Sequence, residues 1–429
     1  MAEKRLPPQS SPFVGELEVP GDKSISHRAV IFASLAKGQS KISHFLDGED
    51  CLRTVEAFRA MGVEIVQDGD SLLITSEGPE SFVEPKTPLY FGNSGTTTRL
   101  MIGLLSGLPF FTTIYGDASL TNRPMGRVTL PLAEMNAKIF GRGNGEYLPL
   151  GIVGQPLRAI HYTLPVKSAQ VKSALLLAGL FADGEMEIVE KTKTRDHTET
   201  MLEAFGVSLD IDGNTIRMEG KQPLSATDVY VPGDISSAAF FLAGAAAKPG
   251  SSLILKKVGL NPTRTGILDV LSQMGAEITI NNKQKIGGEH FGDIHIKSAP
   301  LQGIEISGDI IPRLIDEIPI IALLATQAEG TTIIKDAEEL RVKETDRIDA
   351  VVDVLSTLGA NIKGTEDGMI IEGKTDLNGG EISAYHDHRI AMMGVIASFF
   401  TKEEVVLDDD SSIAISYPRF FEDLNKITL

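Results

Sequence analysis

The residues best able to do chemistry in this chain are cations and hydroxyls that come just before apolar helical runs. A turn at 20–22 brings Lys23, Ser24 and Arg28 to the start of the apolar run 29–35. Amides at a helix N-terminus are unpaired and carry partial positive charge, so such a cluster can bind an anion. Because a Gly-Asp turn is also an ordinary helix cap, the stretch predicts an anion site only if the chain repeats it.

Further cations do occupy comparable positions near predicted helix starts. They are Arg99, Arg123, Arg127, Lys167, Lys172, Arg195, Lys343, Arg347 and Arg389. If buried helices from both halves of the chain direct their N-termini at one cleft, dipoles and cations concentrate positive potential there. The pattern therefore predicts a site for two or more phosphate or carboxylate groups.

Two acidic residues are candidates for proton transfer. Asp316 lies in the apolar run 310–324, which we expect to be one helix, and an unpaired carboxylate there is costly to bury. Burial and nearby cations move its pKa in opposite directions, which suits a tuned acid or base, although a helix-to-loop hydrogen bond is the alternative. Glu344 precedes Arg347 by three residues, so it either acts on a proton or only pairs with that cation.

The elements that position these residues belong to an internal repeat of about 70 residues. Five predicted amphipathic helices end on one signature, in which glycine or its nearest substitute, asparagine, takes a left-handed C-cap position. The signature residues are Gly62, Asn136, Gly206, Gly275 and Gly359.

An earlier half of each unit, a polar turn followed by an apolar helix, occurs six times. These segments begin at Val19, Tyr90, Leu164, Val231, Ile306 and Ile382. The wording Val-Pro-Gly-Asp is shared by 19–22 and 231–234, and it marks two domain crossings. We therefore expect an α/β protein with two domains of three units, one formed by 20–232 and the other by 1–19 plus 233–429.

Composition excludes several classes of function. The chain has 429 residues and a formal net charge of −18, which argues against a nucleic-acid surface and against a polybasic membrane patch. Its one cysteine, Cys51, excludes an internal disulfide and a thiolate metal cage, and suits a cytoplasmic protein. The pairs in 386–388 and 196–197 lack a spaced third ligand, so we expect no metal and no cofactor.

With these motifs assembled, the chain resembles the enolpyruvyl transferases, and among them the EPSP synthases. The matching stretches are PGDKSISHR (20–28), GNSGTTTR (92–99), NRPMGR (122–127), KSAQ (167–170), RVKETDR (341–347) and DHRIAM (387–392). The resemblance implies a two-domain inside-out α/β barrel with three units per domain. It also implies transfer of the enolpyruvyl group of phosphoenolpyruvate to the 5-hydroxyl of shikimate 3-phosphate, a step toward chorismate and the aromatic amino acids.

The resemblance also implies roles for individual residues. Shikimate 3-phosphate would be held by Lys23, Ser24, Arg28, Ser168, Ala169, Gln170, Arg195, Asp316 and Lys343. Phosphoenolpyruvate would be surrounded by Lys23, Gly95, Arg123, Gln170, Arg347 and Arg389. Asp316 would take the hydroxyl proton, and Glu344, Lys23 and His388 are candidates for protonating the methylene carbon. The implied partners are these two small molecules only, bound by a monomer.

Departures from the better-known group place the chain with a second, divergent group. Leu100 replaces a proline, Arg195-Asp196-His197-Thr198-Glu199 replaces a tyrosine-containing segment, and Ile415 replaces a lysine. One alternative is UDP-N-acetylglucosamine enolpyruvyl transferase, whose relatives carry a cysteine that the loop 116–122 lacks. The other is a non-catalytic repeat protein that binds phosphorylated sugars, for which two acids in the cleft have no use. Gly95 also predicts inhibition by glyphosate, an inhibitor of this family.

Overall fold

The computed structural model describes residues 3–428, and these form two compact units. The first, here called the N-unit, comprises Gly21–Val231 and Ile286–Glu289, and the C-unit comprises the rest. The sequence placed all of 233–429 in one domain, whereas the four residues Ile286–Glu289 pack with the N-unit. The physical reason is local, since His197 Nδ1 lies 2.7 Å from Glu289 Oε1 and both side chains are buried.

Among residues 3–428, six of the seven sheets follow one plan, and the seventh pairs only β10 with β12. In five of the six, an edge strand runs parallel to its inner neighbour, the two inner strands pair antiparallel, and the remaining strand lies at the far edge. The sixth is a three-stranded version, in which β24 runs parallel to β25 and β1 pairs antiparallel with it. The sheet orders are β16-β3-β5-β4, β6-β7-β9-β8, β11-β13-β15-β14, β2-β17-β19-β18, β20-β21-β23-β22 and β24-β25-β1.

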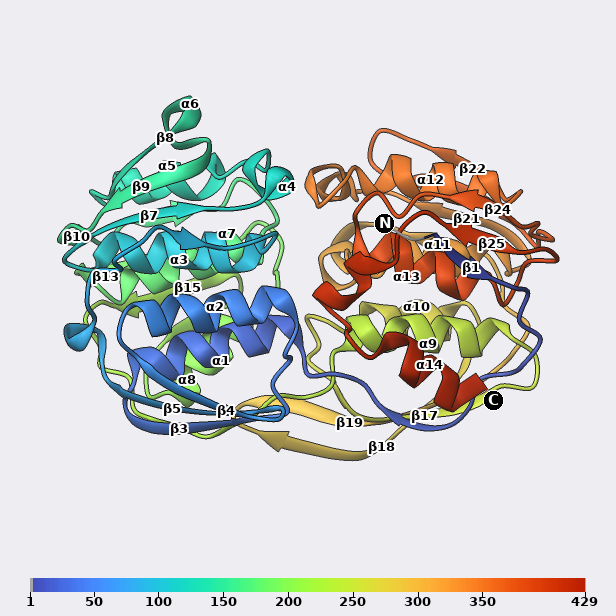
Figure 1. Cartoon of the computed structure of the whole chain (residues 1–429), viewed down its shortest axis with the longest axis horizontal. Coiled ribbons are helices and arrows are strands. Elements are labelled where there is room, and N and C mark those ends of the chain that lie inside the picture. The colour runs from blue at the N-terminus through green and yellow to red at the C-terminus, as the bar shows by residue number, and fades with distance from the viewer. Residues whose placement is uncertain (1–2, 429) are drawn as a thin grey trace. The chain divides into compact units, whose positions relative to one another are not determined.

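The N-unit contains the first three repeats (Figure 1). Its helices are α1 (Lys23–Leu35), α2 (Glu49–Ala60), α3 (Gly95–Gly107), α4 (Ala118–Thr121), α5 (Gly126–Glu134), α6 (Arg142–Gly145), α7 (Ala169–Gly179) and α8 (His197–Ala204), with the 3₁₀ turn η1 (Pro79–Ser81). Its strands are β3 (Lys37–Ser43), β4 (Glu64–Asp68), β5 (Ser71–Glu77), β6 (Leu89–Tyr90), β7 (Phe111–Tyr115), β8 (Lys138–Gly141), β9 (Tyr147–Val153), β10 (Leu157–Arg158), β11 (His161–Thr163), β12 (Ala182–Asp183), β13 (Glu185–Val189), β14 (Asp210–Asp212), β15 (Thr215–Glu219) and β16 (Val229–Tyr230).

The C-unit contains the other three repeats, and the N-terminal segment of the chain supplies two of its strands. Its helices are α9 (Ile235–Ala247), α10 (Gly266–Gln273), α11 (Ile318–Thr326), α12 (Arg347–Thr357), α13 (His388–Ala397) and α14 (Phe420–Thr428), with η2 (Gly308–Arg313), η3 (Glu338–Val342) and η4 (Ser411–Ile415). Its strands are β1 (Lys4–Leu6), β2 (Val14–Glu18), β17 (Ser252–Gly259), β18 (Glu277–Ile286), β19 (Glu289–Lys297), β20 (Glu305–Ile306), β21 (Gly330–Ile334), β22 (Asn361–Gly364), β23 (Met369–Gly373), β24 (Gly380–Ile382) and β25 (Val405–Leu407).

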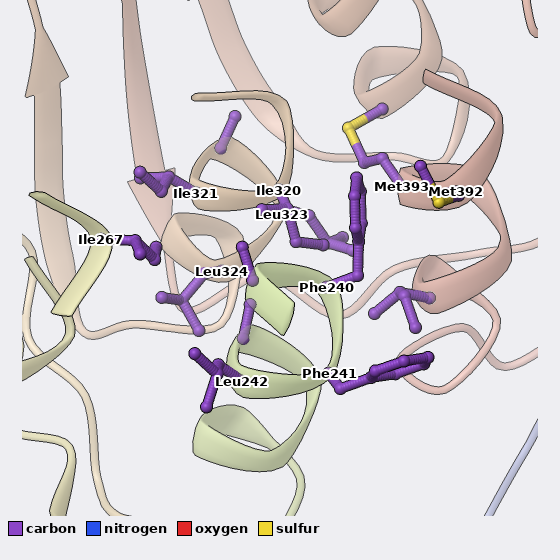
Figure 2. Close-up of a cluster of buried hydrophobic side chains, with 14 of the residues drawn as sticks. Phe240, Phe241, Leu242, Ile267, Ile320, Ile321, Leu323, Leu324, Met392 and Met393 are labelled. Atoms are coloured by element: carbon purple, nitrogen blue, oxygen red, sulfur yellow. The ribbon is translucent and has the colours of Figure 1, made fainter. Parts of the chain in front are cut away.

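One helix per repeat is buried and forms the core of its unit. These helices are α1, α3 and α7 in the N-unit, and α9, α11 and α13 in the C-unit. Figure 2 shows the C-unit core, where Phe240 and Phe241 of α9 lie close to side chains of α11 and α13. Because the buried helices are apolar on nearly every side, polar residues gather at their ends. Three candidate residues, Lys23, Gly95 and His388, are accordingly the first residues of α1, α3 and α13.

The second helix of each repeat is amphipathic and ends as the signature predicts. The second residue after each of five such helices has a positive φ, between 77° and 100°. In this left-handed region a Cβ is costly, so glycine stands at four of these positions and asparagine at the fifth. The five positions are Gly62, Asn136, Gly206, Gly275 and Gly359. The predicted six-unit α/β organisation is thus present in the backbone.

The predicted helix over 310–324 is wrong. The chain forms η2, then a turn over 314–317, and α11 begins only at Ile318. Pro319 lies at the start of α11, where a backbone N–H would have no partner within the helix. A helix that began further upstream would be broken at Pro319, because the proline ring clashes with the preceding turn. Asp316 therefore lies in the turn before the helix, where its side chain is 13% exposed. Within residues 3–428, no helix has the length and apolar character needed to cross a membrane.

Candidate functional site

Lys23 is the first residue of α1 and is already paired with an acid. Its Nζ lies 3.0 Å from Asp50 Oδ2 at the start of α2, and both side chains are largely buried. The turn before α1 is a true N-cap, since Asp22 Oδ1 accepts a hydrogen bond from the backbone N–H of Ile25 at 2.9 Å. The cap and the ion pair together fix the ammonium at the helix N-terminus.

Arg28 joins three helices of the N-unit. Its Nε donates to Thr198 Oγ1 of α8 at 2.7 Å, and its Nη2 donates to Ser173 Oγ of α7 at 2.7 Å. Its Nη1 donates to the carbonyl oxygen of Ser24 at 2.9 Å. The guanidinium is thus held in one orientation near the residue Ser24 that the sequence also predicts in the site.

Gly95 opens α3 directly beneath a guanidinium. A Cβ built on Gly95 would lie 3.0 Å from the carbon and both terminal nitrogens of Arg123. Arg123 is 7% exposed, and its Nη1 donates to the carbonyl oxygen of Asn93 at 3.3 Å. The absence of a side chain at Gly95 therefore lets Arg123 lie against the N-terminus of α3, where both favour an anion.

Gln170 connects α7 to α3. Its Oε1 accepts from Arg99 Nη1 at 2.5 Å, and its Nε2 donates to Thr96 Oγ1 at 2.9 Å. Ser168 is the N-cap residue of α7 and Ala169 is its first residue, so both lie at the same helix start as Gln170. The predicted stretch 167–170 is thus the N-terminal end of a buried helix.

His27 lies behind these residues in α1 and is completely buried. Its Nδ1 lies 2.8 Å from Thr54 Oγ1, and Thr54 Oγ1 lies 2.9 Å from Thr97 Oγ1 of α3. Burial lowers the pKa of His27 well below its usual 6.5, and the charges of Lys23 and Arg28 lower it further. The neutral imidazole therefore links α1, α2 and α3 without adding charge.

Arg347 is the centre of the C-unit cluster. It is 1% exposed, and it pairs with Asp387 (Nε to Oδ2, 2.7 Å), Glu344 (Nη2 to Oε2, 2.6 Å) and Asp316 (Nη1 to Oδ1, 3.2 Å). Burial opposes the charged form, but the three carboxylates outweigh it and raise the pKa of Arg347. The guanidinium is thus a permanent cation that orients three acids.

Asp316 faces two cations rather than one. Besides Arg347, Lys343 Nζ lies 3.4 Å from Asp316 Oδ1. Lys343 and Glu344 lie in the short connection between η3 and α12, so the expected single helix face of 343–347 is not formed. The ion pair between Glu344 and Arg347 nevertheless forms as their spacing predicts.

Arg389 and His388 begin α13. Arg389 Nη1 lies 3.9 Å from Glu317 Oε1, and Glu317 is fully buried. Glu317 accepts a hydrogen bond from Ser236, and Arg264 Nη2 donates to Ser236 Oγ at 2.7 Å. The second Val-Pro-Gly-Asp turn (231–234) is thus followed by Ser236, which binds the carboxylate of Glu317. The first such turn is followed by Lys23 instead.

Three acids that pair with candidate cations were not among the predicted site residues. Asp50 pairs with Lys23, Asp387 with Arg347, and Glu317 with Arg389. For Asp387 a signal existed, because it precedes α13 and caps it by accepting from the backbone N–H of Arg389 at 2.8 Å. Asp50 and Glu317 belong to segments that gave no such signal. The sequence analysis considered Asp387 as a metal ligand and as part of the stretch DHRIAM (387–392), but not as a partner of Arg347.

The family model for EPSP synthase (3-phosphoshikimate 1-carboxyvinyltransferase) matches residues 7–424. The chain belongs to the EPSP synthase family. Curated relatives named 3-phosphoshikimate 1-carboxyvinyltransferase include one from Oceanobacillus iheyensis, 59% identical over 422 residues (98% of both chains). Another, from Geobacillus kaustophilus, is 55% identical over 425 residues, covering 99% of this chain and 100% of the relative.

Solved structures confirm the predicted fold class. The EPSP synthase structure from Acinetobacter baumannii has a TM-score of 0.89 and 45% identity, covering 100% of this chain and 99% of that one. The enolpyruvyl transferase NikO from Streptomyces tendae has a TM-score of 0.81 and covers 99% of this chain and 97% of its own, but its 17% identity speaks only for the fold. The chain therefore has an EPSP synthase-like α/β fold.

Proposed function

We propose that this enzyme transfers the enolpyruvyl group of phosphoenolpyruvate to the 5-hydroxyl of shikimate 3-phosphate and releases phosphate. The observation that carries the proposal is the match of the EPSP synthase family model to residues 7–424. Two clusters of charged residues suit the same chemistry. In the N-unit, cations and helix N-termini gather at Lys23, Arg28 and Arg123. In the C-unit, acids gather around Arg347.

For shikimate 3-phosphate we propose a mixed set of ligands. Arg28, Lys23 and Arg195 supply positive charge, and the start of α7 supplies the hydroxyl of Ser168, the backbone of Ala169 and the amide of Gln170. Ser24, Asp316 and Lys343 complete the proposed set. Charge-assisted hydrogen bonds from guanidinium and ammonium groups recognise a phosphate and a carboxylate more strongly than neutral donors do.

For phosphoenolpyruvate we propose a second set of contacts. The candidates are Lys23, Gly95, Arg123, Gln170, Arg347 and Arg389. Each of the three arginines is at most 7% exposed, so each acts in a dry environment where a charge interaction with phosphate or carboxylate is strong.

The reaction needs one proton removed and one proton delivered. We propose that Asp316, which pairs with Lys343 and Arg347, takes the proton of the 5-hydroxyl as the hydroxyl oxygen attacks C2 of phosphoenolpyruvate. A second group protonates C3, giving a tetrahedral adduct. Loss of a proton from C3 and departure of phosphate from C2 then restore the double bond. Glu344, Lys23 and His388 remain the candidates for handling the proton at C3.

Both substrates are small anions, and the reaction uses no further co-reactant. We propose that the enzyme works on them as a cytoplasmic monomer, which its single buried cysteine suits. A coupled phosphate-release assay tests the function with three mixtures. Phosphoenolpyruvate with shikimate 3-phosphate should release phosphate. Phosphoenolpyruvate alone, or with UDP-N-acetylglucosamine, should release none. Release only with the UDP-sugar, or no release at all, would overturn the proposal.

A further inference from the structure

Lys172 is the centre of a deeply buried ion cluster in the N-unit. It lies in α7, its side chain is 0% exposed, and the side chains of Glu190 and Glu199 around it are 3% and 4% exposed. Its Nζ lies 2.9 Å from Glu190 Oε2 and 2.6 Å from Glu199 Oε1. Because desolvating such a cluster is costly, its ion pairs are weak evidence for a purely stabilising role, and the geometry around them shows what else they hold in place.

Glu190 connects Lys172 to the loop before α8. While its Oε2 pairs with Lys172, its Oε1 accepts two hydrogen bonds from Thr194, from the backbone N–H at 3.1 Å and from the hydroxyl at 2.5 Å. Thr194 is buried and directly precedes Arg195. The buried carboxylate of Glu190 thus fixes the backbone at Thr194, directly before Arg195.

Glu199 anchors the other end of the same loop. It lies in α8, four residues after Arg195, and pairs with Lys172 from there. Burial raises the pKa of Glu199 and outweighs the opposing effect of Lys172. The loop between β13 and α8 is therefore tied at both ends to one ammonium group.

A second link runs beside the first. Ser173 directly follows Lys172, and Thr198 directly precedes Glu199. The Oγ atom of Ser173 lies 2.6 Å from Thr198 Oγ1. Arg28 donates to both hydroxyls. Arg28 and Arg195 are both proposed ligands of shikimate 3-phosphate. The two links therefore fix the position of Arg195 relative to Arg28.

We propose that Lys172 and Glu190 are positioning residues, which act through Thr194 to place Arg195 on the phosphate of shikimate 3-phosphate. The proposal rests on the proposed function above. It goes beyond it by assigning recognition of that phosphate to a buried ion cluster behind the site, in the segment where this chain departs from the better-known EPSP synthases.

The test is a double-mutant cycle on ligand affinity. Glu190→Gln, Arg195→Ala and the double variant are titrated with shikimate 3-phosphate by calorimetry, and separately with shikimate, which lacks the phosphate. Each single variant should bind shikimate 3-phosphate about tenfold more weakly, because a charge-assisted contact is lost or misplaced. The double variant should be no weaker than Arg195→Ala alone, because Glu190 acts through Arg195. Affinity for shikimate should stay within about twofold in all three.

Two further variants keep the test decisive. Thr194→Val preserves shape but removes the hydroxyl that binds Glu190, so it should reproduce the effect if Glu190→Gln does not fold. Asp423→Asn, which removes another buried carboxylate that accepts from Tyr417 at 3.0 Å, is the matched control and should change neither affinity. Losses that add up in the double variant, or equal losses for shikimate, would overturn the proposal. If the wild-type enzyme itself does not bind shikimate 3-phosphate, the proposed function fails first, and the two failures are distinguishable.

Discussion

Replacing Asp316 by asparagine tests the proposed proton transfer most sharply. The change keeps the size of the side chain and removes only its charge. Arg347 retains Glu344 and Asp387 at 2.6 and 2.7 Å, so its guanidinium stays paired and in place. Lys343 is 24% exposed and can be solvated instead. The structure therefore predicts that Asp316→Asn folds and keeps the cluster.

The magnitude of the effect follows from the two roles of Asp316. As a general base it should contribute about 10²–10⁴-fold to the rate, so kcat should fall by that factor. As a partner of Lys343 and Arg347 it is 13% exposed and contributes about 1.5–3 kcal/mol per charged hydrogen bond at most. Binding of phosphoenolpyruvate, whose proposed contacts are cations that remain, should change by less than about threefold.

Steady-state phosphate release gives kcat and both KM values for Asp316→Asn. The matched control is Asp349→Asn, which removes a carboxylate 3.1 Å from Arg341 in an exposed ion pair. This control should leave kcat unchanged within about twofold, since exposed pairs contribute little. If Asp316→Asn kept its kcat and lost affinity for phosphoenolpyruvate instead, Asp316 would be a binding residue and the proton-transfer reasoning would be refuted.

Lys343→Met should weaken shikimate 3-phosphate binding about tenfold, since a charged donor is lost, and unchanged affinity by calorimetry would refute the contact. Gly95→Ala places a methyl group 3.0 Å from the Arg123 guanidinium, so KM for phosphoenolpyruvate should rise about tenfold and glyphosate should inhibit less; equal inhibition of both forms would remove the steric argument. The lowered pKa of His27 means that the unfolded chain binds more protons below about pH 6.5, so stability is fully present above that value and falls as the pH drops. His27→Gln should reduce this acid loss in urea unfolding whereas the exposed His161→Gln should not, and equal losses in both would contradict the assignment.

Local rules explain what could be predicted from the sequence. The left-handed C-cap at Gly62 and its four counterparts depends on a few neighbouring residues, so a repeated signature was enough to reveal the repeat. The cap at Asp22 is local in the same way. The run 310–324 failed because its apolar composition suggested one helix, although Pro312 and Pro319 both limit how far a helix can extend.

Long-range pairing explains what could not be predicted. The ion pairs that hold Lys23 and Arg347 join residues 27 and 40 positions apart, and no spacing rule connects them. The anchoring of Lys172 likewise depends on α7, on the loop after β13 and on α8 meeting in space. The sequence therefore identified the cations together with Asp316 and Glu344, but not the pairing of Asp50, Asp387 and Glu317 with those cations.

Identification of the product tests the central claim most directly. The enzyme is incubated with phosphoenolpyruvate and shikimate 3-phosphate, and the mixture is followed by phosphorus and proton magnetic resonance. The proposed reaction predicts equal loss of both substrates, an equal gain of inorganic phosphate, and new vinyl protons on a product that retains the 3-phosphate. Substrate signals that stay unchanged, or phosphate that appears without a new enolpyruvyl ether, would contradict it.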